Sequence, residues 1–298
     1  MTGRGFPARS ARYAARTEPR LWSFHKRMPG PSQRTAADRT PLPLRVYRHA
    51  RVSLHVFQGI ATTAFVFPMI GLPRRQALIR SWSEHLLRIM HIEARLHGVP
   101  PGGLPGNMLI VANHVSWLDI FVLNTVQPAR FIAKAELKRW PLVGLMIAGC
   151  GTLFIERERR RDAHRVNDHA REVLAAGDTI AIFPEGTTTD GTTLLPFHGS
   201  LLQPVIDAEG HLQPIAIRYL QRDGTYNDAP AYVGNTTFMG SFWRVLGERA
   251  MVVEMTLTPA LAAHGRHRRE LSREAEEAIR AVLGLRGPEP GTNGDRRA

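Results

Sequence analysis

Two residues with the chemistry of a proton-transfer pair, His114 and Asp119, are separated by four residues in the segment NHVSWLD. The apolar residues 108–112 precede them and predict a short buried strand. An imidazole at the carboxyl end of a strand, with a carboxylate about one helical turn further on to orient it, has the parts of a general base. A surface histidine followed by an aspartate at a helix start has the same spacing, so the meaning of the pair depends on the rest of the sequence.

Three further polar patches stand where strands are predicted to end or begin, which is where the active sites of α/β proteins are found. Arg157 closes the segment GTLFIER, Glu185 lies in the segment FPEGT, and residues 213–218 read QPIAIR. Taken singly, each has a simpler explanation: a charge run on a solvated surface, a Pro-Gly turn, and a strand that begins at proline. Together with His114 they define a candidate site.

From residue 92 onward the sequence alternates between strand and helix patterns. The predicted strands are residues 92–96, 108–112, 129–133, 151–155, 179–183, 213–219 and 250–257. Helices are predicted between them, among them residues 163–176, ended by Gly177, and residues 199–208, closed near Gly210. This alternation predicts an α/β domain with a mixed, mostly parallel sheet flanked by helices.

The four patches, in this order and spacing, resemble the lysophospholipid acyltransferase family, which includes the bacterial 1-acylglycerol-3-phosphate acyltransferases. NHVSWLD matches the His-x4-Asp motif of the family, GTLFIER the second motif, FPEGT the third and QPIAI the fourth. The resemblance covers residues 76–285. The fourth motif departs slightly, because Gln213 stands where an apolar residue is common. Four motifs in order are specific for the family, but they leave the lipid that accepts the acyl group open.

The resemblance implies transfer of an acyl group from acyl-CoA or acyl carrier protein to the hydroxyl of a lysophospholipid, with no metal and no resident cofactor. His114 would be the general base that removes the hydroxyl proton, and Asp119 would hold the imidazole tautomer and stabilise the imidazolium. Because the substrate supplies the attacking oxygen, no catalytic serine or cysteine is required. Cys150, the single cysteine, lies in an apolar setting and is expected to be an inert buried thiol.

The other predicted site residues would bind the acceptor. Arg157 suits a phosphate, because its guanidinium offers paired donors. Glu185 is expected to hydrogen-bond an acceptor hydroxyl, Gly186 to allow close approach of the backbone, and Thr187 to help bind the acceptor. Lys134 follows a predicted strand at a position that is often basic in the family. It either assists with the phosphate or the oxyanion, or it faces the solvent.

Positive charge is concentrated near the N-terminus. Residues 1–51 contain twelve Arg or Lys and two acidic residues, which is +10 of the total net charge of +13. Residues 1–44 are expected to be a disordered basic arm that either has no partner or binds an anionic membrane surface. Residues 45–91 are expected to be a membrane-associated helical module, residues 92–285 the catalytic domain, and residues 286–298 a disordered tail. Since little of the charge belongs to the catalytic domain, nucleic acid is not an expected partner.

Residues 52–72 lack Asp, Glu, Lys and Arg and are long enough to cross a bilayer, while residues 76–90 have the pattern of an amphipathic helix. A single crossing that keeps the basic arm in the cytoplasm would place the catalytic domain outside, away from acyl-CoA. We therefore expect both segments to insert shallowly, as a monotopic module on the cytoplasmic face of the inner membrane.

The expected acceptor is 1-acylglycerol-3-phosphate and the expected product is phosphatidate. Residues 188–198, after the third motif, lack the basic residue often found there in phosphatidate-forming enzymes. Another lysolipid, such as a lyso-ornithine lipid, is therefore the alternative within the family. A rival from another class is a non-catalytic basic protein that binds membranes or nucleic acid. It predicts that charge, and not His114, governs the behaviour of the protein.

Overall fold

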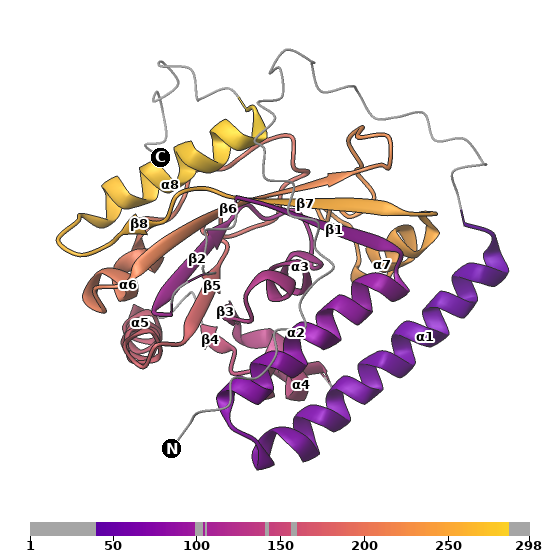
Figure 1. The fold of residues 1–298 in the computed structure, drawn as a ribbon, viewed down its shortest axis with the longest axis horizontal. Helices are drawn as coiled ribbons and strands as arrows, with labels where there is room; N and C mark the ends of the chain where they lie inside the picture. Colours follow the sequence, from indigo (N-terminus) through magenta and orange to yellow (C-terminus); the bar gives the residue numbers. More distant parts are fainter. Residues whose placement is uncertain (1–39, 99–103, 105, 141–142, 156–159, 286–298) are drawn as a thin grey trace, which may run out of the picture.

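A sheet of eight strands lies between layers of helices in the computed structural model, which describes residues 40–98, 104, 106–140, 143–155 and 160–285 (Figure 1). The order across the sheet is β1-β7-β6-β2-β5-β3-β4, and the short β8 pairs with β6. The strands are β1 (Ile92–His97), β2 (Met108–Ala112), β3 (Arg130–Lys134), β4 (Leu153–Ile155), β5 (Thr179–Ile182), β6 (His211–Leu220), β7 (Met251–Leu257) and β8 (Leu261–Ala262). All the predicted strands are confirmed to within two residues, and β8 was not predicted.

Most neighbouring strands run parallel. β2 pairs in parallel with β5 and β6, and β3 pairs in parallel with β5 and β4. β6 is antiparallel to β7 and β8, and β1 is parallel to β7. The predicted mixed, mostly parallel sheet is therefore confirmed. Because β2, β5, β3 and β4 share one direction, the segments that leave their carboxyl ends emerge at the same end of the sheet.

Helices cover both faces of this sheet. One face is covered by α2 (Leu72–Ile89), α3 (Asp119–Val126) and α7 (Phe238–Gly247), and the other by α5 (Arg160–Ala175), α6 (Gln203–Asp207) and α8 (Arg268–Leu283). The remaining short helices are η4 (Ala135–Arg139), α4 (Val143–Gly149) and η5 (Gly199–Leu202). Side chains of β2 alternate between the two cores: Met108 and Ile110 pack with α2 and α3, whereas Leu109 packs with α5 and α8.

The two helices predicted by residue range in this domain are found with small differences. The pattern over residues 163–176 corresponds to α5, and Gly177 ends it in the left-handed region at φ +82°, donating its N–H to Leu174 O. The pattern over residues 199–208 is split, because η5 is a 3-10 turn and only α6 is α-helical.

The N-terminal module is a pair of antiparallel helices (Figure 1). α1 (Leu42–Ala61) continues as the π-helical η2 (Thr62–Val66) and the 3-10 turn η3 (Phe67–Met69), and the chain then returns along α2. α1 begins at Leu42, three residues before the predicted start of the module. Residues 1–39, which are most of the predicted basic arm, and the whole predicted tail, residues 286–298, lie outside the described residues.

Close side-chain contacts hold the two helices of this module together and attach the module to the catalytic domain. The rings of His55 and Trp82 stack at 4.5 Å between centroids, and Trp82 Nε1 donates to His55 O at 3.0 Å. Gly59 permits this approach, because a Cβ there would lie 2.7 Å from Trp82 Nε1. The buried guanidinium of Arg48 on α1 donates to the backbone oxygen of Glu248, the residue that follows α7, at 2.6 Å. The module therefore has a defined position relative to the sheet.

Candidate active site

β2 delivers the predicted base to the carboxyl end of the sheet. The strand ends at Ala112, and the side chain of the next residue, Asn113, continues the pairing with β6. Asn113 Nδ2 donates to Ile217 O at 3.0 Å, and Asn113 Oδ1 accepts from Ile217 N at 2.7 Å. Because both the nitrogen and the oxygen of this side-chain amide are hydrogen-bonded to β6, the chain leaves the sheet at His114 in a fixed direction.

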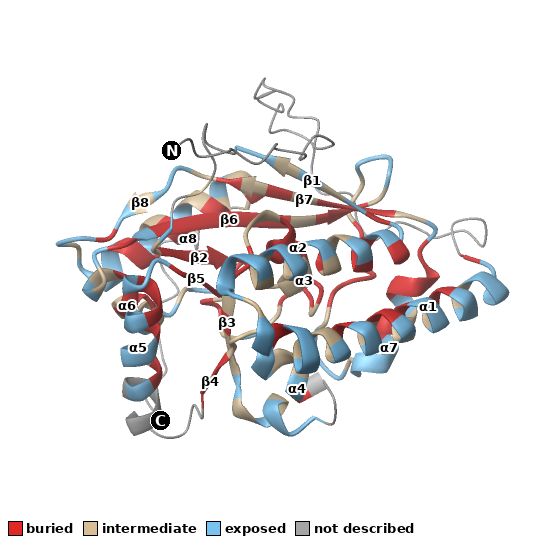
Figure 2. Cartoon of the chain, turned by 60° about the horizontal axis from the view of Figure 1, so that its bottom comes forward, coloured by how far each residue is buried: buried red, intermediate tan, exposed pale blue. Residues whose placement is uncertain are grey.

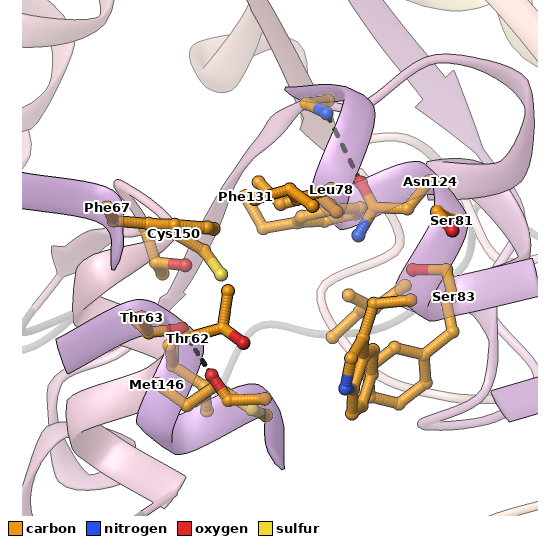
Figure 3. Close-up of a pocket in the computed structure, with 18 of the residues that line it drawn as sticks. Thr62, Thr63, Phe67, Leu78, Ser81, Ser83, Asn124, Phe131, Met146 and Cys150 are labelled. Carbon is orange, nitrogen blue, oxygen red and sulfur yellow. Dashed lines mark hydrogen bonds between the residues drawn. The ribbon is translucent and has the colours of Figure 1, made fainter. Parts of the chain in front are cut away.

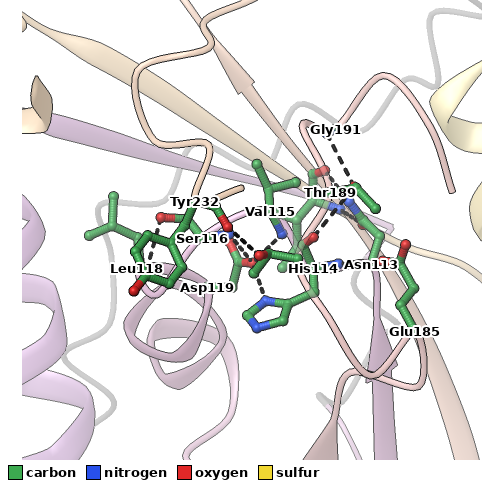
Figure 4. Close-up of polar contacts among 12 residues, drawn as sticks. Asn113, His114, Val115, Ser116, Leu118, Asp119, Glu185, Thr189, Gly191 and Tyr232 are labelled. Carbon is green, nitrogen blue, oxygen red and sulfur yellow. Dashed lines mark hydrogen bonds and ion pairs between the residues drawn. The ribbon is translucent and has the colours of Figure 1, made fainter. Parts of the chain in front are cut away.

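The predicted base and acid are in contact. Nδ1 of His114 lies 2.9 Å from Oδ2 of Asp119, the first residue of α3 (Figure 4). A carboxylate in this position favours the tautomer with its proton on Nδ1, which leaves the Nε2 lone pair for a substrate. The His114 side chain is 20% exposed, whereas that of Asp119 is fully buried. The imidazole is thus accessible while its partner is protected from water.

Four donors surround the Asp119 carboxylate. Oδ2 accepts from the backbone N–H groups of Val115 and Ser116 at 2.8 and 2.9 Å, in addition to its contact with His114. Oδ1 accepts from the hydroxyl of Tyr219 at 2.6 Å. A buried carboxylate is costly unless it is hydrogen-bonded, and this set satisfies both of its oxygens. The same carboxylate, together with burial, raises the pKa of Tyr219 well above its usual value, so the phenol stays a donor.

The imidazole also rests on an aromatic ring. Phe183, the first residue after β5, stacks on His114 with 3.9 Å between centroids and 8° between planes. Phe131 of β3 lies behind Phe183 at 6.1 Å. The ring of His114 is therefore held on one face by packing and at Nδ1 by Asp119, which leaves Nε2 as the group available for proton transfer.

Glu185 ties the third motif to the backbone of the first. Its Oε1 accepts from His114 N at 2.7 Å, and its Oε2 accepts from Leu195 N at 2.9 Å. Burial raises the pKa of Glu185 to about 7, although the two backbone N–H groups and His114 oppose the shift. Both oxygens face the protein, so the side chain positions the loop that carries His114. The expected contact with an acceptor hydroxyl stays a prediction.

The remaining residues of the third motif shape a turn beside the dyad. Gly186 adopts φ +74°, in the region that favours glycine, and donates its N–H to Phe183 O at 3.1 Å. Thr187 is exposed and Thr189 donates its N–H to His114 O at 2.8 Å. The turn thus brings Thr187 to the surface near the base, where the sequence predicted a contact with the acceptor.

Lys134 belongs to the outer part of the same end of the sheet. Lys134 is the last residue of β3, is exposed, and pairs in register with Ile155 at the end of β4. β5 separates β3 from β2, so Lys134 stands two strands from the strand that carries His114. Arg157 lies outside the described residues, two positions beyond the end of β4.

Three residues that position the dyad were not predicted from the sequence: Tyr219 and Phe183 contact it, and Asn113 fixes the chain just before His114. Alternation along β6 indicates that Tyr219 shares a face with Ile217, and that face meets α3. No sequence signal links it to Asp119, a hundred residues earlier. Among the described residues, no group of three or more His, Cys, Asp or Glu side chains is placed to hold a metal ion.

Comparisons with known proteins agree with this geometry. A family model described as "Acyltransferase" matches residues 93–218. The chain is 40% identical over 212 residues to the "Lyso-ornithine lipid O-acyltransferase" of Pseudomonas aeruginosa, covering 71% of this chain and 80% of that relative. It is 39% identical over 189 residues to the "1-acyl-sn-glycerol-3-phosphate acyltransferase" of Neisseria gonorrhoeae, covering 62% of this chain and 73% of that relative.

The fold is similar to the crystal structure of the 1-acyl-sn-glycerophosphate (LPA) acyltransferase, PlsC, from Thermotoga maritima. The TM-score is 0.62 at 21% sequence identity, over 81% of this chain and 94% of that one. This likeness supports the architecture of the sheet and its N-terminal helices.

At the end of a strand in this mostly parallel sheet, an accessible imidazole is backed by a buried carboxylate, which is the arrangement that a general base requires. With the relatives above, the chain belongs to the acyltransferase family and is a lysolipid acyltransferase. The family and enzyme class predicted from the four motifs are therefore confirmed.

Proposed function

We propose that this protein moves an acyl group from acyl-CoA or acyl carrier protein to the free hydroxyl of a lysolipid, with His114 as the general base. The observation that carries the proposal is the contact between His114 Nδ1 and the buried Asp119, which leaves Nε2 accessible. Nε2 takes the proton of the acceptor hydroxyl as its oxygen attacks the thioester carbonyl. A carbon–oxygen bond forms, the carbon–sulfur bond breaks, and the imidazolium returns its proton to the departing thiolate.

An apolar cavity of about 250 Å³ supports an acyl substrate (Figure 3). It lies between the N-terminal module, α3, β3 and α4. Ile120 and Phe121 line it directly after Asp119, and so does Phe131, which lies behind the ring that stacks on His114. A thioester held at the base would therefore have its hydrocarbon chain close to this cavity, out of water.

For the acceptor, we favour a lysolipid with a cationic amine in its head group, such as a lyso-ornithine lipid. The loop after the third motif carries Asp190 and no basic residue up to His198. Asp190 follows Thr189, whose N–H donates to His114 O, so the loop that carries this charge is attached to the segment that carries the base. Asp190 Oδ1 accepts from Thr192, and for Oδ2 the described residues show no partner. A free carboxylate oxygen attracts an ammonium group and repels a phosphate.

The acceptor expected from the sequence, 1-acylglycerol-3-phosphate, remains the second candidate. A phosphate would suit Lys134, which ends β3, and Arg157, which comes two residues after β4 in the sequence. They would also suit the carboxylate of an ornithine head group, so they do not discriminate between the two lipids. The loop around Asp190 does.

The test is an assay of purified full-length protein with a panel of lysolipid acceptors and with both acyl-CoA and acyl carrier protein as donors. We expect product with lyso-ornithine lipid, and lower kcat/KM with 1-acylglycerol-3-phosphate. His114→Ala should lose about a thousandfold in rate on every acceptor, since general base catalysis contributes on that order. Acyl transfer by His114→Ala at the wild-type rate would refute the role of the base. A preference for the phosphate lipid would refute the choice of acceptor.

We also propose that the N-terminal module docks on the cytoplasmic face of the membrane. The helix from Leu42 to Met69 is long and apolar enough to cross a bilayer, judged by length and composition. Only 22% of its most apolar 18 residues are buried in the protein, so most of this apolar stretch is free to contact lipid. Figure 2 shows the exposed surface along α1. Phe65 and Met69 are 74% and 83% exposed at its end, and Arg74 and Arg75 follow at the start of α2. Exposed apolar tips beside cations suit an anionic lipid surface.

Flotation with liposomes tests the docking. The double variant Phe65→Ser, Met69→Ser should lose binding to anionic liposomes, while Leu145→Ser, an exposed apolar residue on α4, is the matched control. Release of the native membrane-bound protein by carbonate would agree with shallow insertion. Cleavage of the catalytic domain by protease added from the outer face would contradict the proposed side.

A further inference from the structure

The lining of the apolar cavity includes two polar side chains, one from α2 and one from α3. Ser83 of α2 and Asn124 of α3 both line the cavity, and in Figure 3 the Ser83 hydroxyl and the Asn124 amide nitrogen point into the same part of it. Their neighbours in the lining are mainly hydrocarbon, among them Leu78, Ile120 and Phe121. Two polar groups that converge in such surroundings call for a partner.

The hydroxyl of Ser83 has none within the described part of the chain, although the residue is only 1% exposed. A serine or threonine inside a helix ordinarily donates to the carbonyl four residues earlier. Two hydroxyls of the same cavity do this, since Thr62 donates to Gln58 O at 2.9 Å and Thr63 to Gly59 O at 2.8 Å. Ser83 instead keeps a buried hydroxyl unpaired, which costs stability unless something binds it.

Asn124 is half engaged. Its Oδ1 accepts from Ala129 N at 3.2 Å, which fixes the amide and turns Nδ2 toward the cavity. The structure gives Nδ2 no partner among the residues it describes. Asn124 Nδ2 is thus a donor held in a defined direction, and the Ser83 hydroxyl near it can both donate and accept.

From this arrangement we propose that the cavity binds an acyl chain that carries a hydroxyl group. A hydroxyl on the chain accepts from Asn124 Nδ2 and donates to Ser83 Oγ, which satisfies both protein groups at once. A keto or ether oxygen only accepts, and an unsubstituted chain leaves both groups unpaired. This inference rests on the proposed function insofar as the cavity holds an acyl chain.

The chain could come from either substrate, the acyl donor or the acyl group already present on the lysolipid. The two sources are separated by placing the hydroxyl on one substrate at a time. In one series the donors are acyl-CoAs of a single length in which one hydroxyl is moved along the chain. In the other series the donor is unsubstituted and the lysolipid carries the hydroxylated chain.

The experiment measures kcat/KM of the full-length protein for each hydroxylated substrate relative to its unsubstituted counterpart. We expect a preference of about tenfold for one position of the hydroxyl, as hydrogen bonds to a substrate hydroxyl provide. Ser83→Ala should abolish that preference, so that hydroxylated and unsubstituted chains give the same kcat/KM in the variant. Thr63→Val removes a hydroxyl from the same cavity that is already paired within its helix, and should keep the preference.

A binding measurement separates this inference from the proposed reaction. Free fatty acids with and without the hydroxyl compete with a fluorescent fatty acid for the full-length protein, and neither His114 nor an acceptor takes part. Tighter binding of the hydroxylated acid, lost in Ser83→Ala, would support the inference even if no acyl transfer were found. Equal affinity for the two acids, or a preference that persists in Ser83→Ala, would overturn it.

Discussion

The hydroxyl of Tyr219 on β6 donates to Oδ1 of Asp119 at the start of α3, with 2.6 Å between the oxygens. This contact joins the acid of the dyad to a strand whose register is fixed by β2 on one side and β7 on the other. Because β6 continues past the end of β2, Tyr219 reaches beneath α3. The tyrosine is therefore a positioning residue for the carboxylate that orients His114.

Replacing Tyr219 with Phe should lower kcat by about tenfold, since a hydrogen bond to a buried charged group is lost while the ring stays in place. The carboxylate would then have one donor fewer and would hold the imidazolium more strongly. We expect the acidic limb of the pH–rate profile to move to higher pH, which is measured with kcat/KM across the pH range.

Tyr47→Phe is the matched control, because that tyrosine is exposed on α1 and takes no part in the hydrogen bonds around Asp119. A Tyr219→Phe variant whose rate falls with an unchanged pH profile would mean that the hydroxyl orients the carboxylate without changing how strongly it holds the imidazolium. A variant with both rate and profile unchanged would mean that the backbone N–H groups of Val115 and Ser116 suffice.

Glu185→Gln should reduce kcat by about tenfold or more, with KM for the acyl donor little changed. The carboxylate accepts from His114 N and Leu195 N, and an amide at this place turns an N–H group toward one of these donors. The backbone of His114 would shift as a result, and its imidazole with it. Circular dichroism establishes that the variant is folded. A rise in KM for the acceptor alone would instead support the contact with an acceptor hydroxyl predicted from the sequence.

The same residue makes the stability of the protein depend on pH. Burial raises the pKa of Glu185 to about 7 from 4.5. A carboxyl whose pKa is higher in the folded state contributes stability that is fully present below about pH 4.5 and is lost as pH rises through about 7, on the order of 3 kcal/mol. Glu185→Gln does not titrate. The difference in free energy of unfolding between wild type and variant, measured by urea denaturation at pH 5 and pH 8, should therefore shift against the wild type at the higher pH.

Periodicity and turn residues predicted the sheet well, because β2, β5 and β7 are largely apolar runs and β1 alternates between buried and more exposed residues. The short α3 was not predicted by itself, since its segment is apolar on all sides and has little helical amphipathicity. The π-helical η2 also escaped prediction, because nothing in Thr62–Val66 distinguishes it from the helix that precedes it. Local patterns thus predicted the strands and the amphipathic helices, and missed the short helices that lack a polar face.

The dyad was predicted because both of its members lie in one short segment. Tyr219 and Phe183 were not, because their contacts depend on which strands become neighbours. β5 and β6 begin at residues 179 and 211, far from β2 in the sequence, and they become its neighbours only in the folded sheet. Glu185 was predicted to belong to the site, but its contacts with two backbone N–H groups were not. Every residue except proline has such a group, so the sequence does not indicate which one a carboxylate will bind.

Asp190→Asn should lower kcat/KM for lyso-ornithine lipid by about tenfold and leave or improve that for 1-acylglycerol-3-phosphate. The substitution removes the negative charge of this loop and keeps an oxygen that can accept from Thr192. Asp223→Asn, in an exposed turn with the same kind of contact to Thr225, is the control and should change neither value. Equal losses on both lipids would mean that Asp190 shapes the loop and does not select the head group.

Cys150 should react slowly with iodoacetamide in the native protein. Burial raises the pKa of its thiol to about 11, so that only on the order of one thiol in a thousand is ionised at pH 8, and the thiolate is the reactive form. The labelling rate should rise about tenfold with each pH unit up to pH 10, and labelling should be complete and fast in urea. Cys150→Ser should retain acyl transfer, because the proposed reaction uses no protein nucleophile. A labelling rate that levels off near pH 8, or a variant without activity, would show that this thiol is not the inert group predicted from the sequence.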